Sequence, residues 1–125
     1  MACAAALAVL DVMAEENLPE RALVIGEWFQ KRLAAVKDTY PLLVGEIRIN
    51  GAMIAMEFIK NGDCEQPNTE LTKKIIAKAK ENSLILLPCG FYGNVIRFLP
   101  PLTIQEETVN EGMDCFDRLL AAVIE

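Results

Sequence analysis

The chain has 125 residues, of which 53% are hydrophobic and 24% are charged, so it has the length of one domain and is too apolar to be disordered. Its net charge of −6 argues against a nucleic-acid-binding protein. It contains no histidine, which excludes histidine general acid–base catalysis, Ser-His and Cys-His nucleophilic pairs, and metal sites that need histidine. A complete small hydrolase or metalloenzyme of the common kinds is therefore not expected.

The four cysteines are widely spaced at Cys3, Cys64, Cys89 and Cys115. No CxxC pair is present, which argues against zinc-ribbon, iron–sulfur and thioredoxin-like sites. Residues 1–10 are apolar, but they carry no positive charge and are too few to span a bilayer. We therefore expect reduced thiols, a cytoplasmic setting and no metal site.

Residues 2–14 are predicted to form a helix rich in alanine. Asp11 is its only charged residue, so this helix is apolar on nearly every side. Such a helix needs to be covered all round. It is therefore either a central core helix or a helix whose partner lies partly outside this chain.

A second helix is expected from Asn17, which can cap it, to just before Pro41. Apolar residues recur along it every three or four positions, which predicts one buried face. They are Leu18, Ala22, Ile25, Phe29, Leu33 and Val36. The apolar period then changes to two, which predicts strands at 44–49 and 52–59. Asn-Gly at 50–51 is a strong hairpin signal, because both turn residues need positive φ.

The polar segment 60–67 is predicted to be a loop, since it contains glycine and proline and shows no apolar period. A third helix is expected over 69–82, with its lysines facing solvent. Two more strands are expected at 84–87 and 94–99. The segment 88–93 between them contains two glycines, which indicate either turn geometry or a close approach to a ligand.

A final helix is predicted to begin at a capping box formed by Thr103 and Glu106. Its inward stripe is expected to be Val109, Met113, Phe116, Leu120 and Val123. The order is then helix, helix, hairpin, helix, hairpin, helix. This order predicts an α+β fold, in which a small and mostly antiparallel sheet made of two hairpins is packed with helices.

Arg97 is the candidate functional residue, because it interrupts the otherwise apolar strand 94–99. Its planar donor fork matches a carboxylate, so it could bind a substrate carboxylate. It could also pair internally, for example with Glu57, or face outward, and composition alone favours these two alternatives. No lysine has the desolvated setting that Schiff-base chemistry needs, and no glycine-rich phosphate-binding loop is present.

Three stretches, 2–10, 44–58 and 84–104, resemble the C-terminal part of the class III, fold type I, pyridoxal-phosphate-dependent aminotransferases. The most specific piece is CGFYGNVIR, residues 89–97, and the branch that it resembles most is the 4-aminobutyrate aminotransferases. The resemblance covers the whole chain, 1–125, but only the small C-terminal domain of such an enzyme. It implies the fold of that domain, and it implies that Arg97 binds the carboxylate of an amino-acid or keto-acid substrate.

The same resemblance places the family's cofactor lysine, ring-binding aspartate and phosphate-binding loop in a large domain that this chain lacks. It implies pyridoxal phosphate in the parent enzyme, none in this chain, and transfer of the amino group of 4-aminobutyrate to 2-oxoglutarate by the parent. It also implies an inactive isolated chain, the parent large domain as partner, a homodimeric full enzyme, and no nucleic-acid or membrane partner. The alternative is a free-standing α+β module that binds a small carboxylate or mediates oligomerisation.

Overall fold

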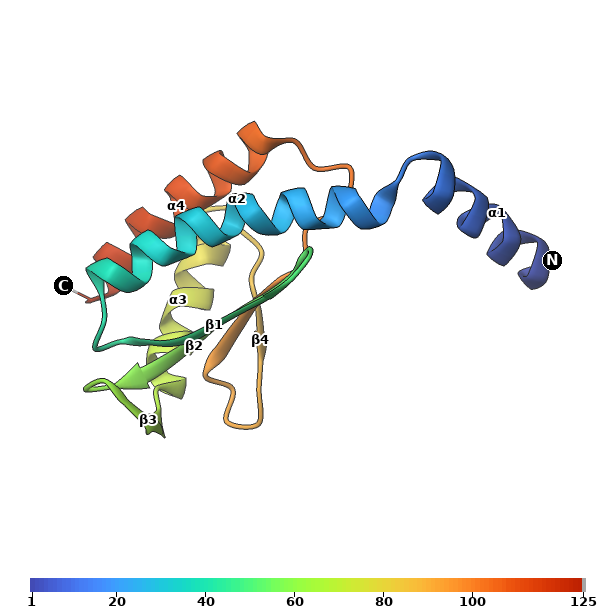
Figure 1. Cartoon of the computed structure of the whole chain (residues 1–125). Helices are drawn as coiled ribbons and strands as arrows, with labels where there is room; N and C mark the ends of the chain where they lie inside the picture. The colour runs from blue at the N-terminus through green and yellow to red at the C-terminus, as the bar shows by residue number, and fades with distance from the viewer. Residues whose placement is uncertain (125) are drawn as a thin grey trace.

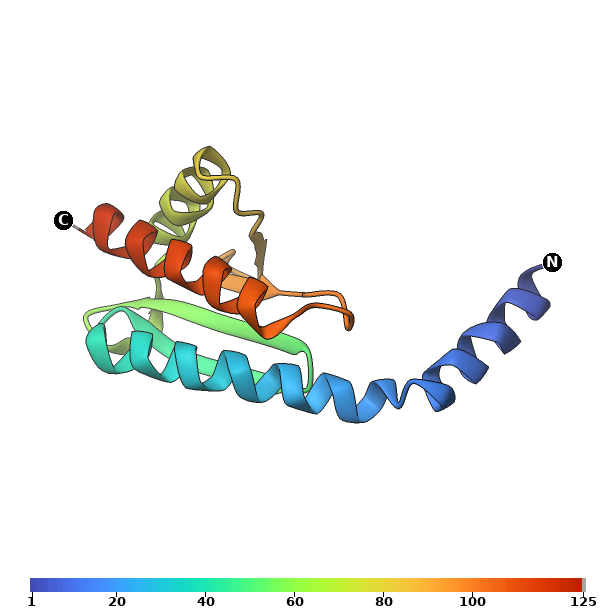
Figure 2. The same cartoon turned by 90° about the horizontal axis from the view of Figure 1, so that it is seen from above.

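The computed structural model describes residues 1–124 and has the predicted α+β fold. The helices are α1 (Ala2–Glu15), α2 (Leu18–Thr39), α3 (Thr69–Glu81) and α4 (Glu106–Ile124). The strands are β1 (Val44–Asn50), β2 (Met53–Lys60), β3 (Asp63–Pro67), β4 (Leu87–Cys89) and β5 (Val95–Phe98). All pair antiparallel in the order β1-β2-β5-β4, and β3 pairs with the end of β2. Helices α2 and α4 lie side by side along the sheet, while α1 extends away from it (Figures 1 and 2).

The core lies between one face of the sheet and the helices α2, α3 and α4. Side chains alternate along a strand, so Ile54, Met56 and Phe58 of β2 all point into this core and are at most 1% exposed. The predicted apolar faces of α2 and α4 pack against these side chains. The inward stripe of α2 is confirmed from Ile25 to Val36, and that of α4 from Val109 to Leu120.

Two strand predictions are wrong. The predicted loop 60–67 contains β3, because Asn61 and Gly62 both adopt positive φ (55° and 76°) and turn the chain back onto β2. The predicted strand 84–87 is instead a connection, and β4 begins at Leu87. After α3 ends, the amide of Leu84 still donates to the carbonyl of Ala79 at 2.9 Å, so Leu84 belongs to the end of α3, and pairing with β5 begins at Leu87.

Two predicted helix caps are also wrong. Asn17 has φ 48°, and its side chain makes no capping hydrogen bond to α2, so it kinks the chain between α1 and α2 instead. Helix α4 begins at Glu106, and the side chain of Thr103 makes no capping hydrogen bond among the described residues. Only the backbone carbonyl of Thr103 is bonded there, and it accepts from the Gln105 side chain at 3.2 Å. Helix α3 has a cap that the sequence analysis did not predict, where the side chain of Asn68 accepts from the amide of Leu71 at 3.2 Å.

Helix α1 contradicts one of the two sequence interpretations, namely that it is a central core helix. Of its fourteen described residues, none is buried, and Leu7, Val9 and Leu10 are each more than half exposed. It is therefore not a core helix of this chain, because nothing within residues 1–124 covers it. No helix in that described range is long and apolar enough to cross a membrane.

An ionic cluster joins α2 to α4. Arg32 lies 2.6 Å from a carboxylate oxygen of Asp114 and 2.8 Å from one of Asp117. The hydrogen bond that Arg32 donates to Asp114 raises the pKa of Arg32, and the neighbouring Asp117 raises it further, although partial burial opposes that shift. The two helices are thus held in a fixed alignment over the sheet.

A close contact between α2 and the hairpin turn depends on a glycine. A Cβ placed on Gly26 of α2 would lie 2.6 Å from the carbonyl oxygen of Gly51, in the turn between β1 and β2. We expect Gly26→Ala to lower the free energy of unfolding by about 1–3 kcal/mol, because this clash outweighs the better helix propensity of alanine. Urea denaturation followed by circular dichroism measures the effect.

Gly112→Ala in α4 is the matched control, because a Cβ there meets only Leu84 at 3.9 Å, an ordinary contact. This variant should raise the free energy of unfolding by about 0.5–1 kcal/mol through helix propensity alone. Equal effects of the two substitutions would contradict the described packing of α2 on the hairpin turn.

Candidate functional site

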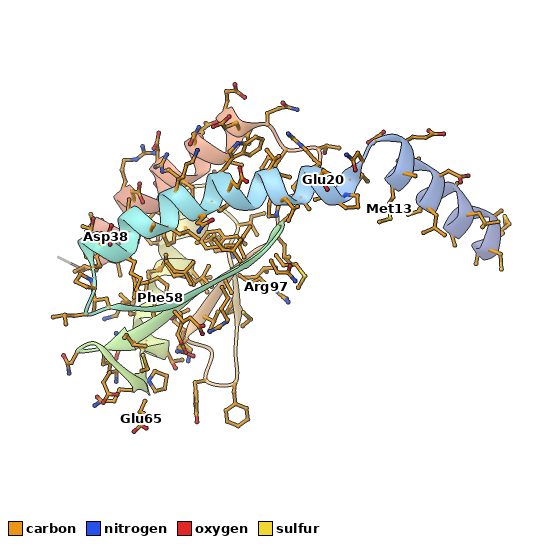
Figure 3. All side chains as sticks on the ribbon, viewed as in Figure 1. Met13, Glu20, Asp38, Phe58, Glu65 and Arg97 are labelled. Atoms are coloured by element: carbon orange, nitrogen blue, oxygen red, sulfur yellow. The ribbon has the colours of Figure 1, made fainter. Side chains whose placement is uncertain are left out.

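Arg97 lies on β5, directly opposite Ala55 of β2 on one side and Leu87 of β4 on the other. Its neighbours in the strand, Ile96 and Phe98, are buried against the helices. Strand alternation therefore places Arg97 on the opposite, open face of the sheet, where its side chain is exposed (Figure 3). The outward-facing alternative of the sequence analysis is confirmed in this respect.

The open face is hollowed beside Arg97. Ala55 separates Arg97 from Arg48 of β1, and its small side chain leaves a hollow of about 240 Å³ between the two arginines. Asn50 and Met53 close one end of it. This hollow can accept a small anion, because its two charged walls are both arginine side chains.

A second and larger hollow of about 540 Å³ also reaches Arg97. It runs from Leu87 and Leu99 to the beginning of α4 at Val109, and apolar side chains make up most of its wall. Arg97 therefore borders a small hollow that lies between two arginines and a larger apolar one. This arrangement suits a ligand that carries a carboxylate on a short hydrocarbon chain.

Arg97 forms no ion pair and no side-chain hydrogen bond within residues 1–124. The alternative that it pairs with Glu57 is wrong. One carboxylate oxygen of Glu57 accepts from the side-chain amide of Asn94 at 3.1 Å, and the other lies 3.9 Å from Arg48. The guanidinium of Arg97 is therefore available to an external carboxylate.

Asn94, directly before β5, is a buried polar residue that the sequence analysis did not single out. It is 2% exposed, and its amide nitrogen donates to the backbone carbonyl of Phe58 at 3.0 Å as well as to Glu57. The backbone carbonyl of Asn94 accepts from the backbone amide of Phe58 at 2.8 Å. A polar residue that opens an apolar strand was the available signal, because such a residue at a strand end often bonds to the neighbouring strand.

The turn between β4 and β5 has the geometry that its glycines predict. Gly90 and Gly93 have φ of 81° and 64°, so the turn-geometry interpretation is confirmed. Phe91 and Tyr92 at its tip are 95% and 61% exposed and contact each other edge to face.

In the described part of the chain, no group of three or more cysteine or acidic residues could hold a metal ion.

Comparison with known proteins gives the family. The model of the aminotransferase class-III family matches residues 1–120. The chain belongs to the class III aminotransferases. It is 44% identical to the 5-aminovalerate aminotransferase DavT of Pseudomonas aeruginosa and 42% identical to the 4-aminobutyrate aminotransferase GabT of Escherichia coli. These matches cover 95% and 94% of this chain, but only 29% and 28% of the two relatives.

Solved structures have the same fold over this part of their chains. An aminotransferase from Bacillus anthracis superposes with a TM-score of 0.84 at 25% identity, over 97% of this chain and 28% of that one. A phospholyase from Arthrobacter, solved with phosphoethanolamine, superposes with a TM-score of 0.80 at 28% identity, over 92% and 27%. The chain thus spans less than a third of the length of these relatives.

Class III aminotransferases use pyridoxal phosphate, and the described residues do not fit that cofactor. The seven lysines lie on outer helix faces or at strand ends, and every one of them is exposed. A lysine that forms a Schiff base needs desolvation or a neighbouring cation to lower its pKa. None of the described lysines has such a setting within this chain.

The geometry predicts opposite roles in stability for Arg97 and Asn94. Arg97→Ala should change the free energy of unfolding by no more than about 0.5 kcal/mol, because the side chain is exposed and unpartnered within the described structure. Asn94→Ala should lower it by about 1–3 kcal/mol, because it removes the hydrogen bond to the partly buried Glu57 carboxylate and one of the two hydrogen bonds to the Phe58 carbonyl, which keeps the amide of Asn68. Chemical denaturation of both variants measures this, and an equal loss in the two would show that Arg97 is structural.

Proposed function

We propose that this chain is the C-terminal small domain of an aminotransferase that moves the amino group of 4-aminobutyrate, or a closely related ω-amino acid, to 2-oxoglutarate. Arg97 binds the substrate carboxylate. The observation that carries this proposal is the exposed guanidinium of Arg97, which borders two hollows and has no partner in the described chain. The relatives named for 4-aminobutyrate and 5-aminovalerate support the substrate class.

An arginine suits this role because every reactant carries a carboxylate. The donor ω-amino acid, the acceptor 2-oxoglutarate and both products can be held through that group by one planar donor fork. Arg97 stands on a strand that is paired on both sides, so its backbone is fixed before the substrate arrives. Such positioning lowers the entropic cost of bringing the amino group to the reacting centre.

The remaining machinery of the reaction lies outside residues 1–124. We propose that a large domain binds pyridoxal phosphate, which supplies the electron sink for the reaction, and that it packs against α1. The uncovered apolar surface of α1 supports this partner, as does the match to less than a third of each relative. The complete enzyme, meaning this chain joined to such a large domain, is proposed to act as a homodimer in the cytoplasm.

Loss of the Arg97 guanidinium should weaken substrate binding in the complete enzyme. We expect Arg97→Ala to raise KM for 4-aminobutyrate and for 2-oxoglutarate roughly ten- to hundredfold, the equivalent of one charged hydrogen-bonded pair. Cofactor content, measured by absorbance, should stay unchanged. Arg118→Ala is the matched control, because Arg118 is an exposed arginine of α4. An unchanged KM in Arg97→Ala would overturn the proposed role of Arg97.

The 125-residue chain alone should not catalyse the reaction. Incubated with pyridoxal phosphate, 4-aminobutyrate and 2-oxoglutarate, it should form no glutamate above a protein-free blank, because none of its lysines has a desolvated setting. The Escherichia coli relative serves as the positive control. Glutamate formation that disappears in the Arg97→Ala chain would show that the chain is a catalyst by itself.

A further inference from the structure

Glu57 is the acidic side chain that the strand geometry places within reach of Arg97. Ala55 is opposite Arg97 and Glu57 is opposite Val95, so Glu57 and Arg97 are diagonal neighbours on the same face of paired strands. Diagonal neighbours in an antiparallel pair have Cα atoms about 7–8 Å apart, which the long side chains of glutamate and arginine can bridge. An Arg97 paired in this way would not be free for a substrate.

The structure holds Glu57 in a different direction. Its Oε1 accepts the hydrogen bond from Asn94, and its Oε2 faces Arg48 on the far side of β2 from Arg97. The same oxygen lies over β1, where a Cβ on Gly45 would be only 3.4 Å from it. Glu57 thus leans over the backbone of Gly45, and both of its oxygens have partners other than Arg97.

Resting on the proposed function, we infer that Asn94 and Arg48 are positioning residues that hold Glu57 away from Arg97 and so keep the Arg97 guanidinium free for the substrate carboxylate. Asn94 is suited to this role because its side-chain amide is fixed by the Phe58 carbonyl at the same time. Arg48 is held in turn by Glu46 at 2.5 Å. Glu57 is therefore held by one hydrogen-bond donor, Asn94, and by the charge of Arg48 at 3.9 Å.

The inference makes a specific kinetic claim. Loss of the Asn94 hydrogen bond or of the Arg48 charge lets Glu57 turn toward Arg97 and compete with the substrate carboxylate. Such competition acts on substrate binding in every bound state alike, so it raises KM and leaves kcat unchanged. A merely structural defect would lower the amount of folded enzyme, and a second substitution at Glu57 would not repair it.

The test uses the complete enzyme with Arg48→Met and Asn94→Ala made separately. Each should raise KM for 4-aminobutyrate and for 2-oxoglutarate about two- to fivefold, the effect expected of a competing surface ion pair. Adding Glu57→Gln to either variant should restore KM, because the neutral amide no longer attracts Arg97. Adding Glu46→Gln to Arg48→Met is the matched control, and it should leave KM raised.

The outcomes separate this inference from the proposed function. The inference is overturned by an unchanged KM in Arg48→Met, or by a raised KM that Glu57→Gln does not restore. Arg48 is about half exposed, so Arg48→Met decides the matter even if Asn94→Ala fails to fold. If Arg97→Ala raises KM while Arg48→Met does not, only the inference fails. If Arg97→Ala leaves KM unchanged, the proposed function itself fails.

Discussion

The arrangement of the open face depends on the antiparallel pairing of β2 with β5. This pairing places Arg97 opposite Ala55 and Val95 opposite Glu57, and it thereby decides which side chains can meet. It is short, since β5 has only four residues, and Asn94 ties its beginning to β2 by three hydrogen bonds to Glu57 and Phe58. A slip of one residue would move Arg97 into the core and Ile96 into solvent.

The buried half of the structure is the part that the sequence predicts well. The stripe of α2 and the alternation of β2 follow from burial, which repeats with the period of the element and so leaves a clear pattern in the residues. The turn Asn61-Gly62 carried the same signal as Asn50-Gly51, but the polar residues of β3 showed no alternation beside it. The signal for β3 was therefore the turn before it, and not an apolar period within it.

The candidate site was only partly predictable. Arg97 could be singled out because a charge in an apolar strand is unusual, but its face and its lack of a partner needed the pairing of three strands. Asn94 stood out only as a polar residue at the start of an apolar strand, and that pattern does not show what it bonds to. Its partners lie 36 and 37 positions away in the chain, and no local pattern records such contacts. The same is true of the direction in which Glu57 leans.

The uncovered state of α1 has a consequence for how the parent protein would assemble. Fourteen residues is a marginal length for an isolated helix in water, even with many alanines. Within the described chain α1 contacts α2, so in the proposed assembly most of the stability of α1 comes from the large domain that it meets. Formation of this helix and docking of that domain are then one coupled transition in the proposed assembly, in which helix order and domain attachment are gained or lost together.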